Sequence, residues 1–95
     1  MFIVLLKFSG DRSRAGQFME GHKAWLQRGF DEGVFLLSGN LQPNAGGAIV
    51  AHGTSLPELQ KRVGADPFVA EKIVAAEILE IALSKSDERL KFLLA

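Results

Sequence analysis

Strand-like and helix-like apolar patterns alternate along this chain, and their order leaves few folds open. Runs of adjacent apolar residues predict strands, whereas apolar residues spaced three and four apart predict helices that cover a sheet. The expected strands are 2–6, 34–41, 48–51 and 76–83, and the expected helices are about 11–31, 55–64 and 87–94. This β-α-β-β-α-β order with a short C-terminal helix predicts an α+β, ferredoxin-like fold, with a four-stranded antiparallel sheet and both main helices on one face.

The connections between these elements carry signals of their own. The segment 42–47 combines Pro, Asn and Gly, the residues of tight turns, so the strands on either side of it are expected to form a hairpin. Ser55 and Glu58 have the spacing of a capping box at the start of a helix. Asp66 followed by Pro67 predicts the N-cap and first position of a further short helical turn.

The segment 76–83 fits two structures. Its two glutamates are three residues apart, as on one helix face, whereas Leu79, Ile81 and Leu83 alternate as on a strand. We predict a strand, because a hairpin that follows a strand and a helix needs a partner for its edges.

The predicted strands are apolar on both of their faces. Helices cover one face of a ferredoxin-like sheet, so the other face would expose a large apolar surface in a monomer, which is unfavourable in water. We therefore predict a homodimer through the sheet face, either as sheet packed on sheet or as a barrel-like closure.

Composition narrows the classes of function. The 95 residues predict a single domain over 1–95, and eleven basic and eleven acidic side chains leave no basic surface for nucleic acid. No cysteine is present and the two histidines lack metal-ligand spacing, so neither a disulfide nor a metal site is expected. The apolar start, Met1 to Phe8, has no positive charge or cleavage site and predicts a strand rather than a signal peptide, hence a cytoplasmic protein with no membrane segment.

His22 lies within the apolar stripe of the first predicted helix. The stripe is formed by Ala15, Phe18, Met19, His22, Trp25, Leu26, Gly29 and Phe30. Because imidazole titrates near neutral pH, a histidine here is either a buried residue with a hydrogen-bond partner or a proton-transfer group at the mouth of a pocket. A catalytic histidine also requires a second group, usually a carboxylate, to orient its ring.

Asp66 is the carboxylate best placed for that second role, because a helix start before a proline lies at the edge of the sheet, where loops gather. The alternative for Asp66 is a plain N-cap. Ser38 and Asn40 flank a glycine and are candidates for contact with polar groups of a substrate, although a strand bulge explains the same residues.

A basic cluster follows the first predicted strand. Lys7, Arg12 and Arg14 come together there, and Arg14 is the member that we include among the candidate substrate-binding residues. A cluster of this kind either binds an anionic substrate or forms a solvated loop.

Several short motifs occur in an order that resembles a known family. His22 is followed by Gly33 eleven residues later, by Gly39 six residues further on, and then by Asp66-Pro67-Phe68. In order and spacing these residues resemble the YCII-related family, over roughly Met1 to Leu83. The resemblance implies a small dimeric ferredoxin-like α+β protein with enzymatic activity, in which the residues at His22 and Asp66 meet in one pocket.

The chain departs from the family pattern around that pocket. Family members usually have an arginine shortly before the histidine and a leucine after it, where this chain has Met19-Glu20-Gly21 and Lys23. Asn40 stands where a proline is usual, and Lys72 stands where a glycine is usual.

Two hypotheses of different classes follow. In the first, the protein is an enzyme for a small-molecule substrate, with His22 as general acid or base, Asp66 as its orienting partner, and proton transfer of the isomerase or lyase type. No cofactor is implied, because the sequence has no dinucleotide-binding glycine pattern and no metal cluster. In the second, the protein is a non-catalytic dimer that binds a ligand or a partner protein, with His22 as a structural residue. A family member that has lost its activity is a third possibility.

Overall fold

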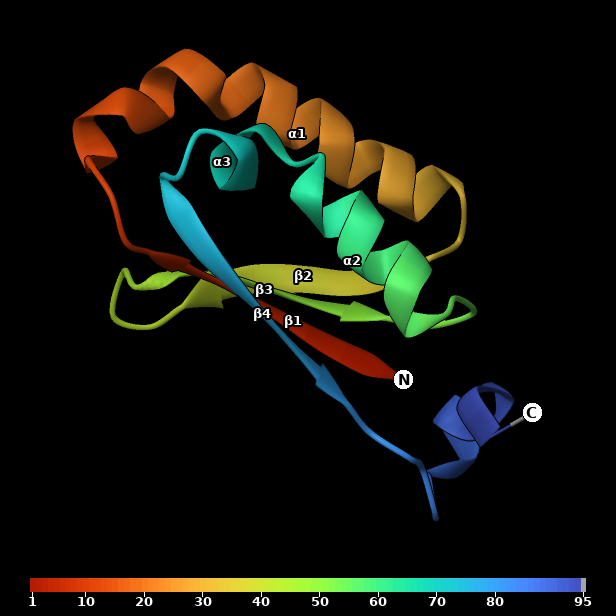
Figure 1. The fold of residues 1–95 in the computed structure, drawn as a ribbon. Coiled ribbons are helices and arrows are strands. Elements are labelled where there is room, and N and C mark those ends of the chain that lie inside the picture. The colour runs from red at the N-terminus through yellow and green to blue at the C-terminus, as the bar shows by residue number, and fades with distance from the viewer. Residues whose placement is uncertain (95) are drawn as a thin grey trace.

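The structure, a computed structural model, describes residues 1–94 and has one antiparallel sheet with its main helices on one side (Figure 1). Its elements are β1 (Phe2–Phe8), the 3-10 turn η1 (Arg12–Arg14), α1 (Ala15–Asp31), β2 (Phe35–Leu41), β3 (Gly46–Ala51), α2 (Leu56–Gly64), α3 (Pro67–Ala70), β4 (Val74–Glu80) and the 3-10 helix η2 (Glu88–Leu94). The strand order is β2-β3-β1-β4, and every pair is antiparallel. The predicted α+β, ferredoxin-like arrangement is confirmed.

The core lies between the sheet and the helices. Because β1 is paired on both sides, its alternate residues Phe2, Val4 and Leu6 lie under the helices and are buried. Helix α1 contributes Trp25, and α2 contributes Leu59 to the same cluster. Burying an apolar side chain of this size stabilises the fold by about 1.5–3 kcal/mol relative to leaving it exposed.

The ends of the helices follow the predicted signals with one change. Asp11 accepts a hydrogen bond from the Ser13 backbone N–H at 2.9 Å, so it caps η1, while α1 begins at Ala15 without a side-chain cap. Helix α1 ends at Asp31 with a Schellman motif around Gly33, whose φ is 75°. Ser55 caps α2 as predicted, since its hydroxyl accepts the Glu58 backbone N–H at 3.3 Å.

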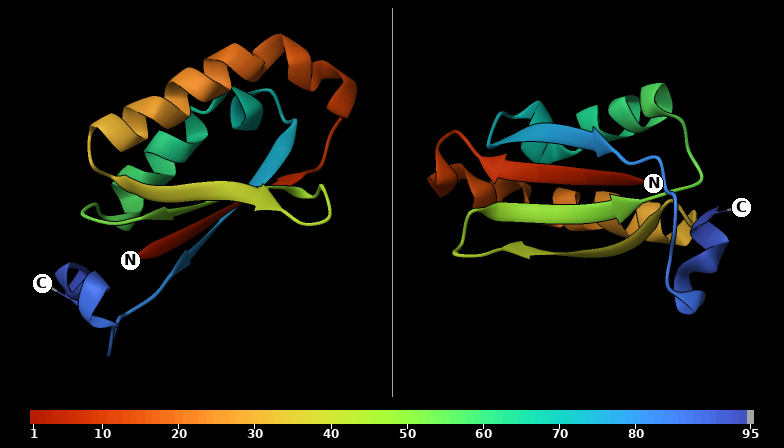
Figure 2. Two further views of the ribbon diagram at one scale, coloured as in Figure 1. Left: turned by 180° about the vertical axis from the view of Figure 1, so that it is seen from behind. Right: turned by 90° about the horizontal axis from the view of Figure 1, so that it is seen from below.

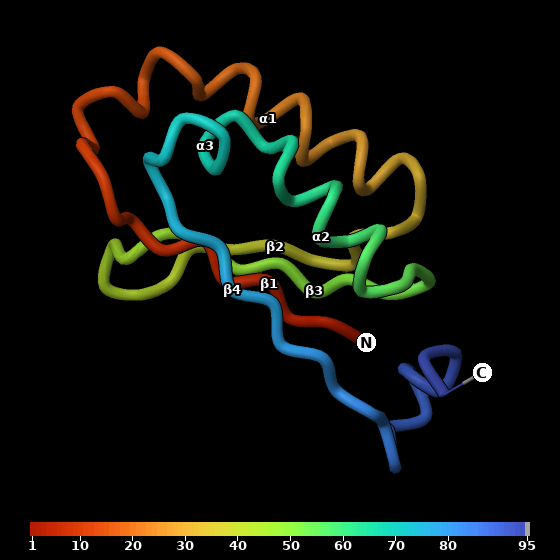
Figure 3. The backbone as a smooth tube through the Cα atoms, in the orientation of Figure 1, coloured from red at the N-terminus to blue at the C-terminus, as the bar shows by residue number. Residues whose placement is uncertain are grey.

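The last predicted strand is confirmed as a strand, but it covers Val74–Glu80 rather than 76–83. It ends earlier because its partner β1 runs out at Phe2. Beyond that point Ile81 donates its N–H to the Met1 carbonyl at 2.9 Å, and the N-terminal amine of Met1 donates to the Ile81 carbonyl at 3.4 Å. The chain then leaves the end of β4 on the side of the sheet opposite to α1 (Figure 3). There it forms the predicted C-terminal helix as a 3-10 helix.

Neither α1 nor α2 covers the other face of the sheet, and η2 lies on that side beyond the ends of the strands (Figure 2). We call this face of the sheet the bare face. Its apolar residues, by strand register, are Ile3, Leu5, Leu37, Leu41, Ala48, Val50, Ala75 and Leu79. Leu37 is 58% exposed and Leu79 is 42% exposed. No helix within residues 1–94 is long and apolar enough to cross a bilayer.

Candidate active site

Helices α1 and α3 bring His22 and Asp66 together. The Nδ1 atom of His22 lies 2.9 Å from Oδ1 of Asp66. The Asp66 side chain is completely buried, whereas the His22 side chain is 18% exposed. A residue from the middle of α1 and the N-cap of α3 thus form one pair, although 44 positions separate them in the sequence.

The hydrogen bonds of Asp66 define how the imidazole is protonated. Oδ1 also accepts the backbone N–H of Phe68 at 3.0 Å, as an N-cap does. An ionised carboxylate only accepts hydrogen bonds, so Nδ1 of His22 is the donor in this pair and Nε2 carries the lone pair of the neutral ring. Nε2 makes no hydrogen bond within residues 1–94, and it is not sealed from solvent. The two alternatives for Asp66, N-cap and ring partner, hold at the same time.

Aromatic contacts fix the plane of the His22 ring. Phe68 stacks on it with ring centroids 4.2 Å apart and an interplanar angle of 7°. Trp25 lies 5.8 Å away at 29°. With one hydrogen bond and two stacked rings, the imidazole has little freedom to rotate away from its position.

Gly21 allows α1 to approach α3 closely enough for the pair to form. A Cβ atom at Gly21 would lie 3.1 Å from Cγ of Pro67, which is tighter than ordinary van der Waals contact. The absence of a side chain at Gly21, directly before His22, therefore lets the imidazole reach the Asp66 carboxylate.

A cavity of about 510 Å³ opens between α1 and the sheet, and His22 is part of its wall. The cavity is lined by Leu6, Phe8, Met19, His22, Lys23, Leu26, Asn40, Gln42, Asn44, Gly46, Gly47, Phe68 and Val74. Most of these residues are apolar, and the polar ones are an imidazole, an ammonium group and three amides. This is the usual character of a small-molecule site, an apolar pocket with a few polar groups that orient a ligand.

A bulge in β2 turns Ser38 and Asn40 toward this region. Phe35 pairs with Ala51 and Leu37 pairs with Val50, so Leu36 is an extra residue in the strand. Residues directly opposite each other in an antiparallel pair share a face of the sheet.

The extra residue reverses the alternation of the faces beyond it. Ser38 therefore lies opposite the buried Ile49, and Asn40 lies opposite Gly47, both on the helix side. Ser38 and Asn40 line a smaller cavity of about 110 Å³, to which His22 also contributes. Between the alternatives for 38–40, a bulge is present, but it is centred on Leu36.

Arg14 lies apart from this group. Its guanidinium forms an ion pair with Glu71 at 3.2 Å and lies 5.5 Å from the centroid of the Phe18 ring. It does not line either cavity that includes His22. The structure therefore brings together His22, Asp66, Ser38 and Asn40, but not Arg14.

The candidates predicted from sequence did not include several residues of the cavity wall. Lys23 follows His22 directly, and neighbours in a helix do not share a face, so helical spacing alone does not group them. Gln42 and Asn44 belong to the turn after β2, and they meet residues of α1 in this cavity only through the tertiary fold.

No family model and no curated protein matches this sequence. One of the solved structures that it resembles is the 5-chloro-2-hydroxyhydroquinone dehydrochlorinase TftG from Burkholderia phenoliruptrix AC1100, in complex with 2,5-dihydroxybenzoquinone. The TM-score is 0.69 at 14% sequence identity, and the match covers 88% of this chain and 96% of the other. At 14% identity the similarity shows that the two proteins share a fold. The shared fold extends over nearly the whole of both chains.

Proposed function

We propose that the protein is an enzyme of the YCII-related type that acts on a small molecule, with His22 as its proton-transfer group. The observation that carries the proposal is the pair of His22 Nδ1 and Asp66 Oδ1 at 2.9 Å, with the same imidazole in the wall of a cavity of about 510 Å³. Asp66 holds the ring in place and, as a carboxylate, stabilises the imidazolium that forms when Nε2 accepts a proton.

The burial of Asp66 supports a functional role over a purely structural one. Its second oxygen, Oδ2, is buried without a hydrogen-bond partner in the described chain. Leaving a buried polar atom unpaired costs about 1–3 kcal/mol, and more for a charged group. An N-cap alone would not require this, since serine or threonine at Asp66 could also accept the Phe68 N–H.

The proposed reaction is proton transfer of the isomerase or lyase type. Nε2 of His22 takes a proton from a carbon or oxygen of the substrate, and the electron pair of that bond stays on the substrate as an enolate or expels a leaving group. The imidazolium, stabilised by Asp66, then returns the proton to a second position or to the leaving group. Ser38 and Asn40 bind polar groups of the substrate from β2.

The dehydrochlorinase of similar fold lends support to this reaction class. Its complex holds a small oxygenated ring compound, and the cavity beside His22 has room for a ligand of that size. We extend to this chain only the class of reaction, the removal of a proton from a small ring-sized molecule.

The proposed enzyme is a cytoplasmic homodimer that buries the bare face. Leu37 and Leu79 would otherwise expose a continuous apolar surface together with Ile3, Leu5 and Val50. Light scattering should give twice the chain mass of 10.3 kDa, and Leu37→Glu should give the monomer. A wild-type mass near that of one chain contradicts the dimer.

Hydrogen exchange tests the proton transfer without knowledge of the product. A panel of small ketones, phenols and organic acids is incubated with the protein in D2O, and loss of ligand C–H signals is followed by proton NMR. A compound that exchanges should do so about 10²–10⁴-fold more slowly with His22→Gln. Equal rates for the two proteins rule out the proposed role of His22.

The second candidate is a non-catalytic ligand-binding dimer, and the packing of the ring favours it. His22 stacks on both Phe68 and Trp25, which is also what a structural histidine would do. Under this alternative His22→Gln lowers the free energy of unfolding but leaves ligand affinity unchanged, and no member of the panel exchanges.

A further inference from the structure

We infer that the cavity beside His22 binds a small organic anion and that Lys23 supplies the charge that holds it. The inference rests on the cavity of the proposed function and names the class of its substrate. It does not depend on whether His22 transfers a proton.

Charge in the cavity wall has one sign. Among residues 1–94, Lys23 is the one lining residue with a permanent charge, and no carboxylate of this part of the chain lines the cavity. Asp66 is completely buried beyond His22 and already accepts two hydrogen bonds. Within residues 1–94, Lys23 takes part in no ion pair. An ammonium group without a carboxylate partner at the mouth of an apolar cavity attracts an anion.

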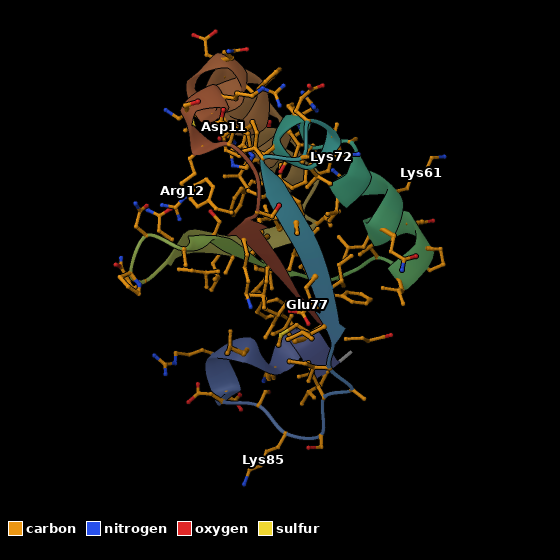
Figure 4. All side chains as sticks on the ribbon, turned by 60° about the vertical axis from the view of Figure 1, so that its left-hand side comes forward. Asp11, Arg12, Lys61, Lys72, Glu77 and Lys85 are labelled. Atoms are coloured by element: carbon orange, nitrogen blue, oxygen red, sulfur yellow. The ribbon has the colours of Figure 1, made fainter. Side chains whose placement is uncertain are left out.

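A second cation lies at the rim of the same cavity. Arg12 donates a hydrogen bond to the Asn44 carbonyl at 2.7 Å, and its guanidinium lies 4.2 Å from the centroid of the Phe8 ring. Phe8 and Asn44 both line the cavity. Figure 4 shows Arg12 between the start of α1 and the β2–β3 hairpin.

Within the described residues 1–94, no acidic group forms an ion pair with Arg12. A carbonyl and an aromatic ring orient the guanidinium but carry no net charge. The neighbouring Asp11 directs Oδ1 to Ser13, whose hydroxyl lies at 2.6 Å and whose backbone N–H lies at 2.9 Å. In contrast, Arg14 is paired with Glu71, so its charge is compensated away from the cavity.

The rest of the wall describes the body of the ligand. Phe8, Met19 and Phe68 offer apolar surface for a flat ring. Asn40 and Gln42 offer amide groups that both donate and accept hydrogen bonds, which suits neutral hydroxyl or carbonyl oxygens on that ring. The ligand class is therefore a ring-sized monoanion, a carboxylate or an acidic enol or phenol, with further oxygen substituents.

Paired probes that differ in charge test this assignment. Binding of 4-hydroxybenzoate and of its neutral amide, 4-hydroxybenzamide, is measured by NMR titration of the full chain at neutral pH. The benzoate should shift the resonances of His22 and Phe68 and bind more tightly than the amide. Lys23→Gln should weaken benzoate binding about five- to tenfold, because one partly solvated charge contact is lost. The affinity of the neutral amide should stay unchanged in this variant.

Arg28→Gln is the matched control. Arg28 lies on the same helix and lines a separate groove beside Trp25, so its replacement removes the same charge without touching the cavity. Benzoate affinity should stay within twofold of the wild type in this variant. Benzoate affinity should also fall as salt is added, and the amide affinity should not.

Three results would overturn the inference. They are equal affinity of benzoate and amide for the wild type, an unchanged benzoate affinity in Lys23→Gln, and the absence of cavity shifts with any carboxylate tested. The proposed function fails separately, when His22→Gln leaves proton exchange unchanged. Charge-dependent binding with no loss of exchange in His22→Gln would support the anion site and reject the catalytic role.

Discussion

His22 and Trp25 lie one helical turn apart on the inner side of α1, and both rings donate an N–H to the neighbouring helices. Trp25 donates Nε1–H to the carbonyl of Arg62 at 2.9 Å and is 2% exposed. His22 donates Nδ1–H to the Asp66 carboxylate at the same distance, and its other edge faces a cavity. The acceptor for Trp25 is the Arg62 carbonyl, a neutral backbone group that is present whatever side chain stands at position 62. The Asp66 carboxylate is a buried group whose Oδ2 has no hydrogen-bond partner within residues 1–94.

This difference separates stability from function along a single helix. At the end of α1 that carries Trp25, the Phe35 ring packs against both Trp25 and Gly29 and leaves no open space. The indole N–H of Trp25 has its hydrogen-bond partner in the Arg62 carbonyl. The part of α1 that carries His22 borders an open cavity and contacts a buried carboxylate whose desolvation lowers the stability of the fold. Substitutions around Trp25 should therefore change the free energy of unfolding, and substitutions around His22 should change ligand chemistry.

Trp25→Ala should have the largest effect on stability. Removing a fully buried aromatic ring leaves a cavity and costs about 3–5 kcal/mol of unfolding free energy. Unfolding by urea is followed by circular dichroism. Trp25 is the one tryptophan of the chain, so its replacement removes the tryptophan fluorescence that would otherwise report unfolding. Trp25→Phe keeps most of the ring and leaves the Arg62 carbonyl unpaired, so it should cost less, about 1–3 kcal/mol. A loss below 1 kcal/mol in Trp25→Ala contradicts the comparison.

Alanine at three glycines of α1 should rank the closeness of packing along the helix. A Cβ atom at Gly29 would overlap the ring of Phe35, so Gly29→Ala should destabilise by about 1–3 kcal/mol. A Cβ atom at Gly16 would meet no atom within 4 Å in residues 1–94 apart from its own stretch of helix, so Gly16→Ala should stabilise by up to about 1 kcal/mol through helix propensity.

Gly21→Ala should fall between these two in stability, and it also tests the site. The new methyl group pushes against Pro67 and lengthens the contact between His22 and Asp66. The expected readout is a changed His22 ring resonance, with no such change in Gly16→Ala. An unchanged resonance in Gly21→Ala would show that α3 moves with the pair intact.

Asp66→Asn should have a small effect on stability and a large effect on function. The amide oxygen still accepts the Phe68 and His22 N–H groups, and the burial of a charge is relieved, so unfolding free energy should change by less than about 1 kcal/mol. Proton exchange of a responsive ligand should fall about 10²-fold or more, because a neutral partner stabilises the imidazolium less. A loss of stability like that of Trp25→Ala would place Asp66 among the structural residues.

The smallest effect is expected at Asp11, an N-cap aspartate with no ring partner. The side-chain hydrogen bond from Ser13 lowers the pKa of Asp11 below its usual value, so this bond stabilises the fold above the ordinary aspartate pKa and is lost as pH falls through the lowered one. Ser13→Ala should raise the Asp11 pKa toward its usual range in a carbon-detected NMR titration. The Asp87 pKa, lowered by the Arg89 side chain, should stay where it is.

The order of elements was predictable because each rests on local signals. The apolar run of β1 and the caps at Ser55 and Asp66 lie where the sequence placed them. The predicted turn at 42–47 is present but shorter, because β3 already begins at Gly46 rather than at Ala48. The end of β4 was not predictable in the same way. It depends on where β1, far away in the chain, stops offering hydrogen bonds.

The candidate site was predictable in part. His22 and Asp66 were chosen by residue type and by family resemblance, and the structure places them in contact. Arg14 was chosen by proximity in sequence, but Glu71 pairs with it from the other end of the α3 segment. Lys23 lies outside the apolar stripe, so helical spacing did not identify it. It lines the cavity because the cavity borders a wider part of the surface of α1 than the packed core does.

The extra residue Leu36 has a consequence for how this cavity could change in evolution. Deletion of that single codon would remove the bulge but keep the faces beyond it, because Leu37 would then follow Phe35 directly and still pair with Val50. If Leu36 were kept and paired with Val50 in place of Leu37, every later residue of β2 would shift by one position. Leu37 and Leu41 would then point toward α1, and Ser38 and Asn40 would move to the bare face. Loss of the extra residue is therefore compatible with the ligand pocket, whereas its inclusion in the strand pairing would replace the pocket by an apolar core.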